Sequence, residues 1–423
     1  MRRLHRRQFL KSGGLMGAAL VVSRRSAWGA GPNEQINVGI VGCGIRGNEH
    51  LKSFRKLSGV RVAGLCDPDC ERLDKSAQNV PDVRRWTDMR DMFQSADIDA
   101  VVIAACNHWH ALAAIWALEA GKHVYVEKPL SLTHWEGRQI VEAAHRHGRI
   151  AQVGTQQRSD AMQSELKHFL HSERALGRIR WVLVNRYGAR ASIGLRDTPL
   201  APPKSIDYDL WLGPAEDRPI YRNALHYDWH WVWNTGSGEM GNWGVHVLDD
   251  VRNVVFQDQA TVPEKLIGAG DRFAWHDAGD TPNLQFVVAE AANIPVVISV
   301  CNISDGPKSM TDDSTAGPRT GYVVFGDEGR LEGQRGEAIA FDTDGRQLRK
   351  FKGTTGENTH RQNFIDAVRS NDSSRLHAPI EQGHYSTAWC NLSNIVTSLS
   401  HGNGTTSLGK LVDEFQLPAA SDV

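Results

Sequence analysis

Short apolar runs alternate with helix-like stretches through the first part of the chain. Strands are expected at 37–41, 60–66, 100–105 and 123–127, and helices at 45–57, 69–78 and 108–120. Thr133 and Glu136 form a capping-box pattern that opens a further helix ending at Gly148. Strands that alternate with helices of this length are typical of a parallel sheet covered on both faces. The pattern therefore predicts a doubly wound α/β domain over residues 31–154.

The pattern changes after residue 154. A long strand is expected at 178–187, followed by a loop at 188–238 that is rich in Pro, Asp and aromatic residues. Further strands are expected at 284–290, 295–302, 321–325 and 337–342, and closing helices at 360–369 and 384–398. Few helices lie between these strands, which favours an α+β domain with a mostly antiparallel sheet over residues 155–423. We expect the closing helices to pack back on the first domain.

The first 30 residues have the layout of a secretory signal. Arg2, Arg3, Arg6 and Arg7 precede an apolar stretch at 13–22, which is too short to span a bilayer. Small residues suited to a cleavage site follow at Ala27 and Gly29. The run from Arg6 to Lys11 resembles a twin-arginine export signal, which a receptor reads. We therefore expect a periplasmic or otherwise exported protein; a basic N-terminal helix is the alternative.

Composition narrows the range of partners. The 423-residue chain carries a formal net charge of −1 and no long run of like charge, so neither nucleic acid nor a membrane surface is an expected partner. Its hydrophobic fraction of 40% is ordinary for a soluble globular protein. Six cysteines are spread along the chain without the spacing of a metal site or a disulfide framework. We expect six free thiols and no bound metal.

A glycine-rich loop follows the first expected strand, in the order Gly42-Cys43-Gly44-Ile45-Arg46-Gly47. A helix is expected after it, and Asp67 ends the next strand, 20 residues after Gly47. This context is that of a dinucleotide-binding turn, whose glycines let the pyrophosphate approach the helix N-terminus. Asp67 would accept from the ribose hydroxyls and disfavour a 2′-phosphate, so NAD is expected rather than NADP. The alternative is a structural turn followed by a solvated aspartate.

Lys128 follows the strand at 123–127, in the order Glu127-Lys128-Pro129. This position would put its amine beside a nicotinamide ring. Burial and the positive charge of the cofactor would both lower the pKa of such a lysine. An amine with a lowered pKa can exchange a proton with a substrate hydroxyl near neutral pH.

The chain resembles the glucose–fructose oxidoreductase and inositol dehydrogenase (Gfo/Idh/MocA) family. The resemblance rests on the glycine loop, Asn107-His108-Trp109-His110, the segment from Gly121 to Pro129, Trp211-Leu212-Gly213-Pro214, and His360 with Phe364. It implies a Rossmann domain followed by an open-faced sheet domain, with a pyranose or polyol between the sheet and the nicotinamide. It also implies that Lys128 is catalytic and that Glu127 and Pro129 shape the turn beneath the nicotinamide. Members of the family are expected to form homo-oligomers.

The second half of the family's site is a helix carrying Asp, then His, then Asp. The pattern falls on Asn242, His246 and Asp249, at positions i, i+4 and i+7 of one helical face. The resemblance implies that His246 transfers a proton and that Asp249 binds substrate hydroxyls. Asn242 departs from the pattern because an amide can orient His246 but cannot stabilise its charged form. A buried core histidine is the alternative for His246.

Further residues are placed in the cleft by the resemblance. Asn107, His110 and Gln156 would contact the cofactor and Arg158 the substrate, although a role in loop structure is equally open. For His226 and His230 we prefer substrate contact to metal binding. The loop before the expected catalytic helix is rich in aromatic residues, which stack on sugar rings: Trp211, Tyr221, Tyr227, Trp229, Trp231, Trp233 and Trp243. Trp243 is expected to contact the substrate, as is Asn242, and core packing explains some of the other aromatic residues.

The expected function is oxidation of a sugar or polyol hydroxyl by a bound nicotinamide. An exported enzyme has no free pool of this cofactor, so a second substrate would recycle it, or the reaction would be redox-neutral. A redox-neutral reaction would resemble that of NAD-dependent glycoside hydrolases or of epimerases, which oxidise one ring carbon transiently. A sugar-binding protein without turnover is a further alternative; Asn242 favours it, whereas Lys128 and His246 argue against it.

Overall fold

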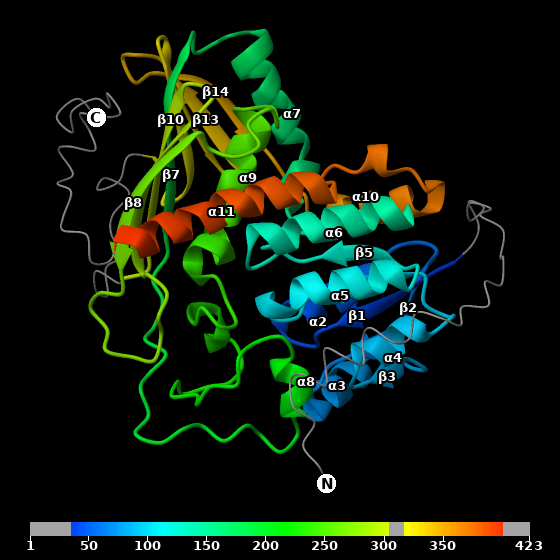
Figure 1. Ribbon diagram of the computed structural model, residues 1–423. Helices are drawn as coiled ribbons and strands as arrows, with labels where there is room; N and C mark the ends of the chain where they lie inside the picture. Colours follow the sequence, from blue (N-terminus) through cyan, green and yellow to red (C-terminus); the bar gives the residue numbers. More distant parts are fainter. Residues whose placement is uncertain (1–34, 304–316, 401–423) are drawn as a thin grey trace.

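The computed structural model describes residues 35–303 and 317–400 (Figure 1). The expected export signal at 1–30 lies outside the described residues. Within these ranges, no helix is long and apolar enough to cross a membrane.

The first half of the chain forms a six-stranded parallel sheet in the order β3-β2-β1-β4-β5-β6. Its strands are β1 (Ile36–Val41), β2 (Val60–Cys66), β3 (Arg84–Trp86), β4 (Ala100–Ile103), β5 (His123–Val126) and β6 (Ala151–Val153). The helices are α2 (Ile45–Phe54), α3 (Cys70–Ala77), α4 (Met89–Gln94), α5 (Asn107–Glu119) and α6 (His134–His147). This sheet confirms the predicted doubly wound α/β fold.

Local sequence explains the element ends in this half. Every residue of β4 is buried, as its unbroken apolar run predicts. Thr133 and Glu136 form the predicted capping box at the start of α6, and Gly148 ends the helix with a φ of 57°.

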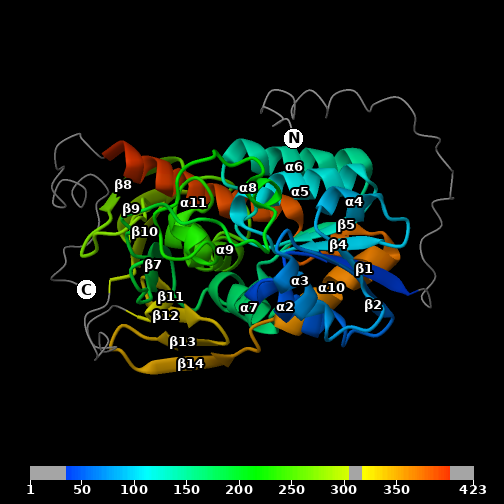
Figure 2. The ribbon, with the colours of Figure 1, turned by 90° about the horizontal axis from the view of Figure 1, so that it is seen from below.

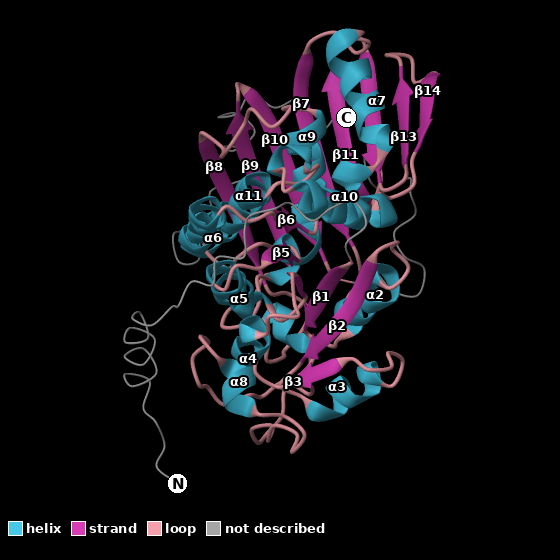
Figure 3. Cartoon of the chain, turned by 90° about the vertical axis from the view of Figure 1, so that its right-hand side faces the viewer, coloured by secondary structure: helices cyan, strands magenta, loops and turns pink. Residues whose placement is uncertain are grey.

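The second half forms an eight-stranded sheet in the order β14-β13-β12-β11-β7-β10-β9-β8 (Figure 3). Its strands are β7 (Ile179–Tyr187), β8 (Lys265–Asp271), β9 (Leu284–Ala291), β10 (Ile294–Cys301), β11 (Thr320–Gly326), β12 (Gly329–Gln334), β13 (Glu337–Phe341) and β14 (Gln347–Lys352). All neighbours are antiparallel except β7 and β10. The predicted, mostly antiparallel sheet is thus confirmed.

Helices cover one face of this sheet. They are α7 (Ala161–Lys167), α9 (Val245–Val254) and α11 (Ile380–Ser400), which lie on one side of the strands in Figure 2. Their apolar residues share one core with the sheet, including Leu166, Leu248 and Trp389. Among the described residues, the other face carries no helix. Gln285 of β9 bonds to α11, so its exposed neighbour Phe286 points to that other face.

The closing helices join the two halves. Helix α10 (Glu357–Ser370) packs on α2, and its Phe364 is buried in the core of the first sheet. Helix α11 begins with Ile380 in the core beside β6 and carries Trp389 into the core of the second sheet. The orange and red helices in Figure 1 therefore fix the first sheet against the second.

Candidate cofactor and substrate site

A cleft of about 450 Å³ opens at the carboxyl ends of the parallel strands. It lies where the strand order reverses between β1 and β4, which is where doubly wound folds bind their ligands. The predicted residues that line it are Gly42, Gly44, Ile45, Arg46, Asp67, Asn107, His110, Glu127, Lys128, His230, Asn242 and Trp243. Sequence reasoning missed other lining residues, among them Arg72, Asp88, Arg90 and Asp209.

The glycine loop fits a dinucleotide pyrophosphate. Gly42 has a φ of 92°, and a Cβ added there would lie 2.5 Å from the Ala104 carbonyl oxygen. A Cβ on Gly47 would lie 1.7 Å from the Gly42 oxygen, so only glycine allows this approach of helix and strand. Gly44 caps α2, and no described side chain bonds to that helix N-terminus. Its backbone N–H groups can therefore receive an anion.

Asp67 directly follows β2, at the rim of the same loop. Its carboxylate accepts from the Cys43 N–H at 2.6 Å and from the Asp69 N–H at 2.9 Å. Burial raises the pKa of this carboxyl. Asp67 therefore holds the glycine loop while it lines the cleft at the position expected for a ribose contact.

Replacing this carboxylate tests the ribose contact. We expect Asp67→Asn to weaken NAD binding about tenfold to a hundredfold, because a hydrogen bond to a charged acceptor contributes about 1.5–3 kcal/mol. Titration calorimetry with NAD would measure it. Asp74→Ala, at an exposed position on the next helix, is the control. An unchanged dissociation constant in Asp67→Asn would rule out the contact.

The amine of Lys128 is held by one residue of the second half. Its Nζ donates to the Asn242 carbonyl oxygen at 2.6 Å and to Asn242 Oδ1 at 3.2 Å. Burial, opposed by Glu127 and assisted by Arg46, lowers the pKa of Lys128 to about 8. The structure thus corrects the expected role of Asn242, whose amide orients Lys128 rather than His246.

A buried carboxylate fixes the orientation of that amide. Asn242 Nδ2 donates to Glu239 Oε2 at 3.2 Å, so Oδ1 must face Lys128. Glu239 also accepts from Arg186 Nε at 2.7 Å and from Arg190 Nη2 at 3.0 Å. The acid missing at position 242 is therefore present three residues upstream, where it acts on the lysine through the amide.

The segment expected as one helix has two parts. Met240–Gly244 is a π-helical turn, and α9 begins at Val245, so Asn242 and His246 do not follow simple α-helical spacing. His246 is 7% exposed, lies edge-on to Trp243 with ring centroids 5.6 Å apart, and makes no hydrogen bond with the described residues. Burial and the charges of Arg335 and Lys128 hold its pKa far below the usual value. The imidazole is therefore neutral and free to bond a ligand.

Asp249 and Arg158, both expected to bind substrate, bond to each other instead. Arg158 Nε lies 2.8 Å from Asp249 Oδ2, and both side chains are at most 2% exposed. Ser386 Oγ donates to Asp249 at 2.6 Å, and Asp258 accepts from the rest of the guanidinium. Neither residue lines the cleft. The physical reason is that a buried carboxylate needs a charged partner, which Arg158 supplies.

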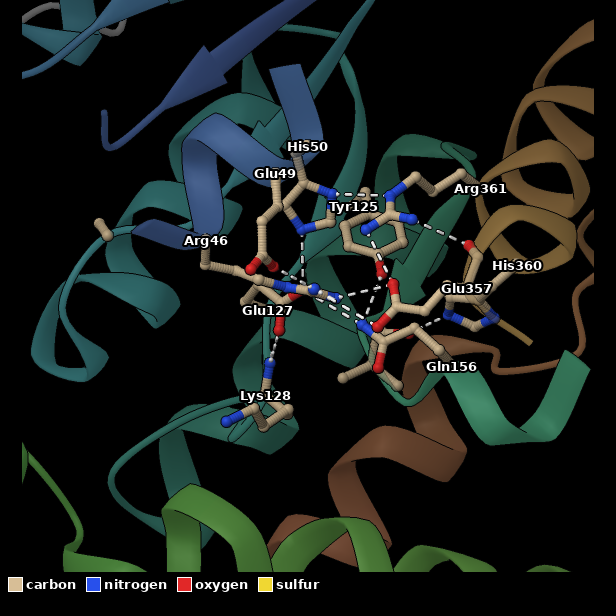
Figure 4. Close-up of polar contacts among 12 residues, drawn as sticks. Arg46, Glu49, His50, Tyr125, Glu127, Lys128, Gln156, Glu357, His360 and Arg361 are labelled. Carbon is tan, nitrogen blue, oxygen red and sulfur yellow. Dashed lines mark hydrogen bonds and ion pairs between the residues drawn. The ribbon is translucent and has the colours of Figure 1, made fainter. Parts of the chain in front are cut away.

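Glu127 is the centre of a buried polar cluster (Figure 4). It accepts from Arg46 Nε at 2.7 Å, His50 Nε2 at 2.8 Å and Gln156 Nε2 at 3.3 Å. Although burial opposes it, Arg46 and His50 keep the pKa of Glu127 well below its usual value. Gln156 is buried beneath this cluster and does not line the cleft. Glu127 thus fixes the turn that carries Lys128.

The remaining predicted residues line the cleft with their own anchors. Asn107 accepts from Ser237 Oγ at 3.2 Å, and His110 Nδ1 lies 2.7 Å from the Pro129 oxygen. The ring of His230 stacks on that of Trp229, with ring centroids 3.6 Å apart. Burial lowers the pKa of His230 to about 3. His226 also lines the cleft, and its Nε2 lies 3.0 Å from Asp69 Oδ2.

The sequence predicted six free cysteines and no metal site. All six cysteines are free, as predicted. In the described ranges, no group of three or more His, Cys, Asp or Glu residues could hold a metal ion.

Two family models match the chain. Residues 36–155 match the NAD-binding Rossmann fold of the Gfo/Idh/MocA oxidoreductase family, and residues 192–290 match its C-terminal alpha/beta domain. The chain belongs to the Gfo/Idh/MocA family.

Relatives within the Gfo/Idh/MocA family have different names. A "Glycosyl hydrolase family 109 protein" of Shewanella pealeana is 36% identical over 171 residues, which are 34% of this chain and 38% of that protein. "Inositol 2-dehydrogenase 4" of Saccharopolyspora erythraea is 36% identical over 148 residues, which are 34% of this chain and 44% of that protein. The matches thus span about two fifths of these relatives.

Solved structures extend the likeness to both halves. A levoglucosan dehydrogenase in complex with NADH and levoglucosan superposes with a TM-score of 0.66 at 18% identity, covering 87% of this chain and 98% of that one. At this identity the likeness shows the fold.

Proposed function

We propose that the protein is an NAD-dependent oxidoreductase acting on a hydroxyl of a sugar or polyol, with Lys128 as the proton acceptor. The observation that carries this proposal is the amine of Lys128 at the wall of the NAD-type cleft. A neutral lysine has two N–H bonds and one lone pair, and Asn242 offers two acceptors for those two bonds. The lone pair remains for the proton of a substrate hydroxyl.

Other residues in and beside the cleft support substrate binding. NAD, when bound, would supply a hydride acceptor for the carbon that bears the reacting hydroxyl. Neutral His246 lies beside Trp243 but does not itself line the cleft, and from there it can bond the same hydroxyl or share its proton. Trp229 and Trp243 line the cleft, where aromatic side chains can contact the C–H groups of a sugar.

Export from the cytoplasm would require the enzyme to regenerate its bound cofactor without a free pool of NAD. The signal-like residues 1–30 support a protein that carries its cofactor out of the cytoplasm and recycles it with a second substrate. Fractionation of cells that produce the full chain would check this location, because a protein confined to the cytoplasm would contradict it.

Hydrolysis of a glycoside is the second candidate, and it is favoured by the name of the Shewanella relative. In that reaction, oxidation at one ring carbon would acidify the neighbouring C–H and allow the aglycone to leave. Lys128 and His246 would serve the same proton transfers, and the cofactor would end each cycle unchanged.

One experiment separates these functions. The purified protein is denatured, the released nucleotide is identified, and the absorbance of the bound cofactor is followed while sugars and aryl glycosides are added. We expect released NAD or NADH, and reduced cofactor that accumulates with a sugar. Aglycone release without net reduction would favour the hydrolase. A protein with no nucleotide, and no spectral change after NAD and sugars are added, would contradict both enzymes.

A further inference from the structure

Arg335 reaches the site from the second sheet, at the turn between β12 and β13. Its guanidinium carbon lies 5.2 Å from the ring centre of Trp243, which lines the cleft, whereas Arg335 itself lies behind that ring and does not line the cleft. Arg186 lies 4.7 Å from the centre of the same ring. Trp243 therefore has two guanidinium neighbours close to the proposed reaction centre.

The two arginines differ in their partners. Arg186 is bonded to the carboxylate of Glu239, whereas Arg335 has no carboxylate within 4.0 Å among the described residues. In the described part of the chain, Arg335 donates to the side-chain oxygens of Gln157 and Gln156, each at 3.4 Å, which are long contacts to neutral acceptors. The half-buried guanidinium thus has no counter-ion within residues 35–303 and 317–400.

Other arginines around the cleft form ion pairs with acidic side chains. Arg46 pairs with Glu127, Arg158 with Asp249, and Arg190 with Glu239. Arg335 is also close enough to lower the pKa values of His246 and Lys128. Its free charge therefore lies beside the groups proposed to move the substrate proton.

We propose that Arg335 binds the carboxylate of the substrate, and that the substrate is an acidic sugar such as a uronic acid or its glycoside. This inference rests on the function proposed above and names its substrate class. A guanidinium binds a carboxylate through two parallel N–H···O bonds, which are stronger than its contacts to neutral amides. One unpaired guanidinium balances the single negative charge of a carboxylate, whereas a phosphate dianion would need a second cation.

Binding to the full-length, NAD-loaded protein tests the proposal without requiring turnover. Titration calorimetry would compare methyl glycosides in matched pairs, the uronic acid against the neutral hexose, in the gluco, galacto and manno series. In one series at least, we expect the acid to bind about tenfold or more tightly than its neutral partner. The Arg335→Gln variant should lose that preference while it still binds the neutral sugar.

A matched variant controls for charge and for the hairpin. Arg330→Gln, on β12 of the same hairpin, removes an arginine that is already paired with Glu332. It should keep the preference for the acid. Glucose 6-phosphate, added as a competitor, distinguishes a carboxylate site from a phosphate site.

Two binding results would overturn the inference: no acidic glycoside binds, or each neutral glycoside binds as tightly as its acidic counterpart. Tighter binding of glucose 6-phosphate than of every acid would also overturn it. So would an Arg335→Gln variant that binds the acidic and the neutral glycoside of a pair more weakly by the same factor. The last would show a structural role for Arg335. Failure of the proposed function is separate, because acids could then bind through Arg335 without any reduction of the cofactor. Conversely, an Arg335→Gln variant that keeps the full preference for the acid, in a protein that reduces its cofactor with sugars, would refute only the present inference.

Discussion

Replacing Lys128 with alanine should lower kcat/KM for alcohol oxidation by about 10²–10⁴-fold, the range that a positioned general base contributes. The variant loses the only amine that Asn242 holds at the cleft wall, while the glycine loop that would bind NAD is unchanged. NAD affinity should therefore stay close to that of the parent protein. Initial rates with a reactive sugar and a separate NAD titration would measure the two effects.

The pH profile gives an independent readout of the same group. Oxidation needs Lys128 in its neutral form, so kcat/KM should rise as the pH increases through about 8 and then level off. A bound nicotinamide cation would lower this apparent pKa. The rising limb should vanish in Lys128→Ala and persist in the control Lys52→Ala, which alters an exposed residue of α2. Full turnover by Lys128→Ala would refute the assigned role.

Replacing Asp249 with alanine should destabilise the fold by about 3 kcal/mol, the lower end of the cost of breaking a buried ion pair. Arg158 would stay buried with only Asp258 as a charged partner, and Ser386 would lose its acceptor. Urea unfolding, followed by circular dichroism, would measure the free energy of unfolding.

The control separates a structural role from substrate binding. Asp258 bonds the same guanidinium but is 25% exposed, so Asp258→Ala should cost less because water can replace it. If Asp249 were a substrate ligand, as its place in the family pattern suggests, Asp249→Ala would have the same free energy of unfolding as the parent protein but a lower kcat/KM. That result would overturn the structural role described above.

Four strands of the first sheet were predictable because local sequence determines them, whereas the three-residue strands β3 and β6 were not expected. The central strand β4 is buried on both faces, so the apolar run at 100–105 stands out, and Thr133 with Glu136 marks a helix start. The edge strand β3 has no buried position and gives no such signal. The second sheet was predictable only in part. Strand β14 has five exposed positions out of six, and β12 contains two glycines, so neither shows the alternation expected of a half-buried strand.

The candidate site shows the same division. The glycine loop, Asp67 and Lys128 lie at positions that a strand–turn–helix pattern identifies. The bonds from Glu239 through Asn242 to Lys128 join residues 114 positions apart, so only tertiary structure reveals them. The π-helical turn at Met240–Gly244 also breaks the regular spacing from which a shared helical face was inferred.

Helix α11 has a thermodynamic consequence for the whole molecule. One end of the helix is buried with the first sheet through Ile380, and its middle is buried with the second through Trp389. Either half without the other would leave apolar surface of this helix in water, at a cost of about 25 cal/mol for each Å² exposed. The two halves are therefore expected to unfold as one cooperative unit, and a chain cut before α11 should lose the packing that holds both walls of the cleft together.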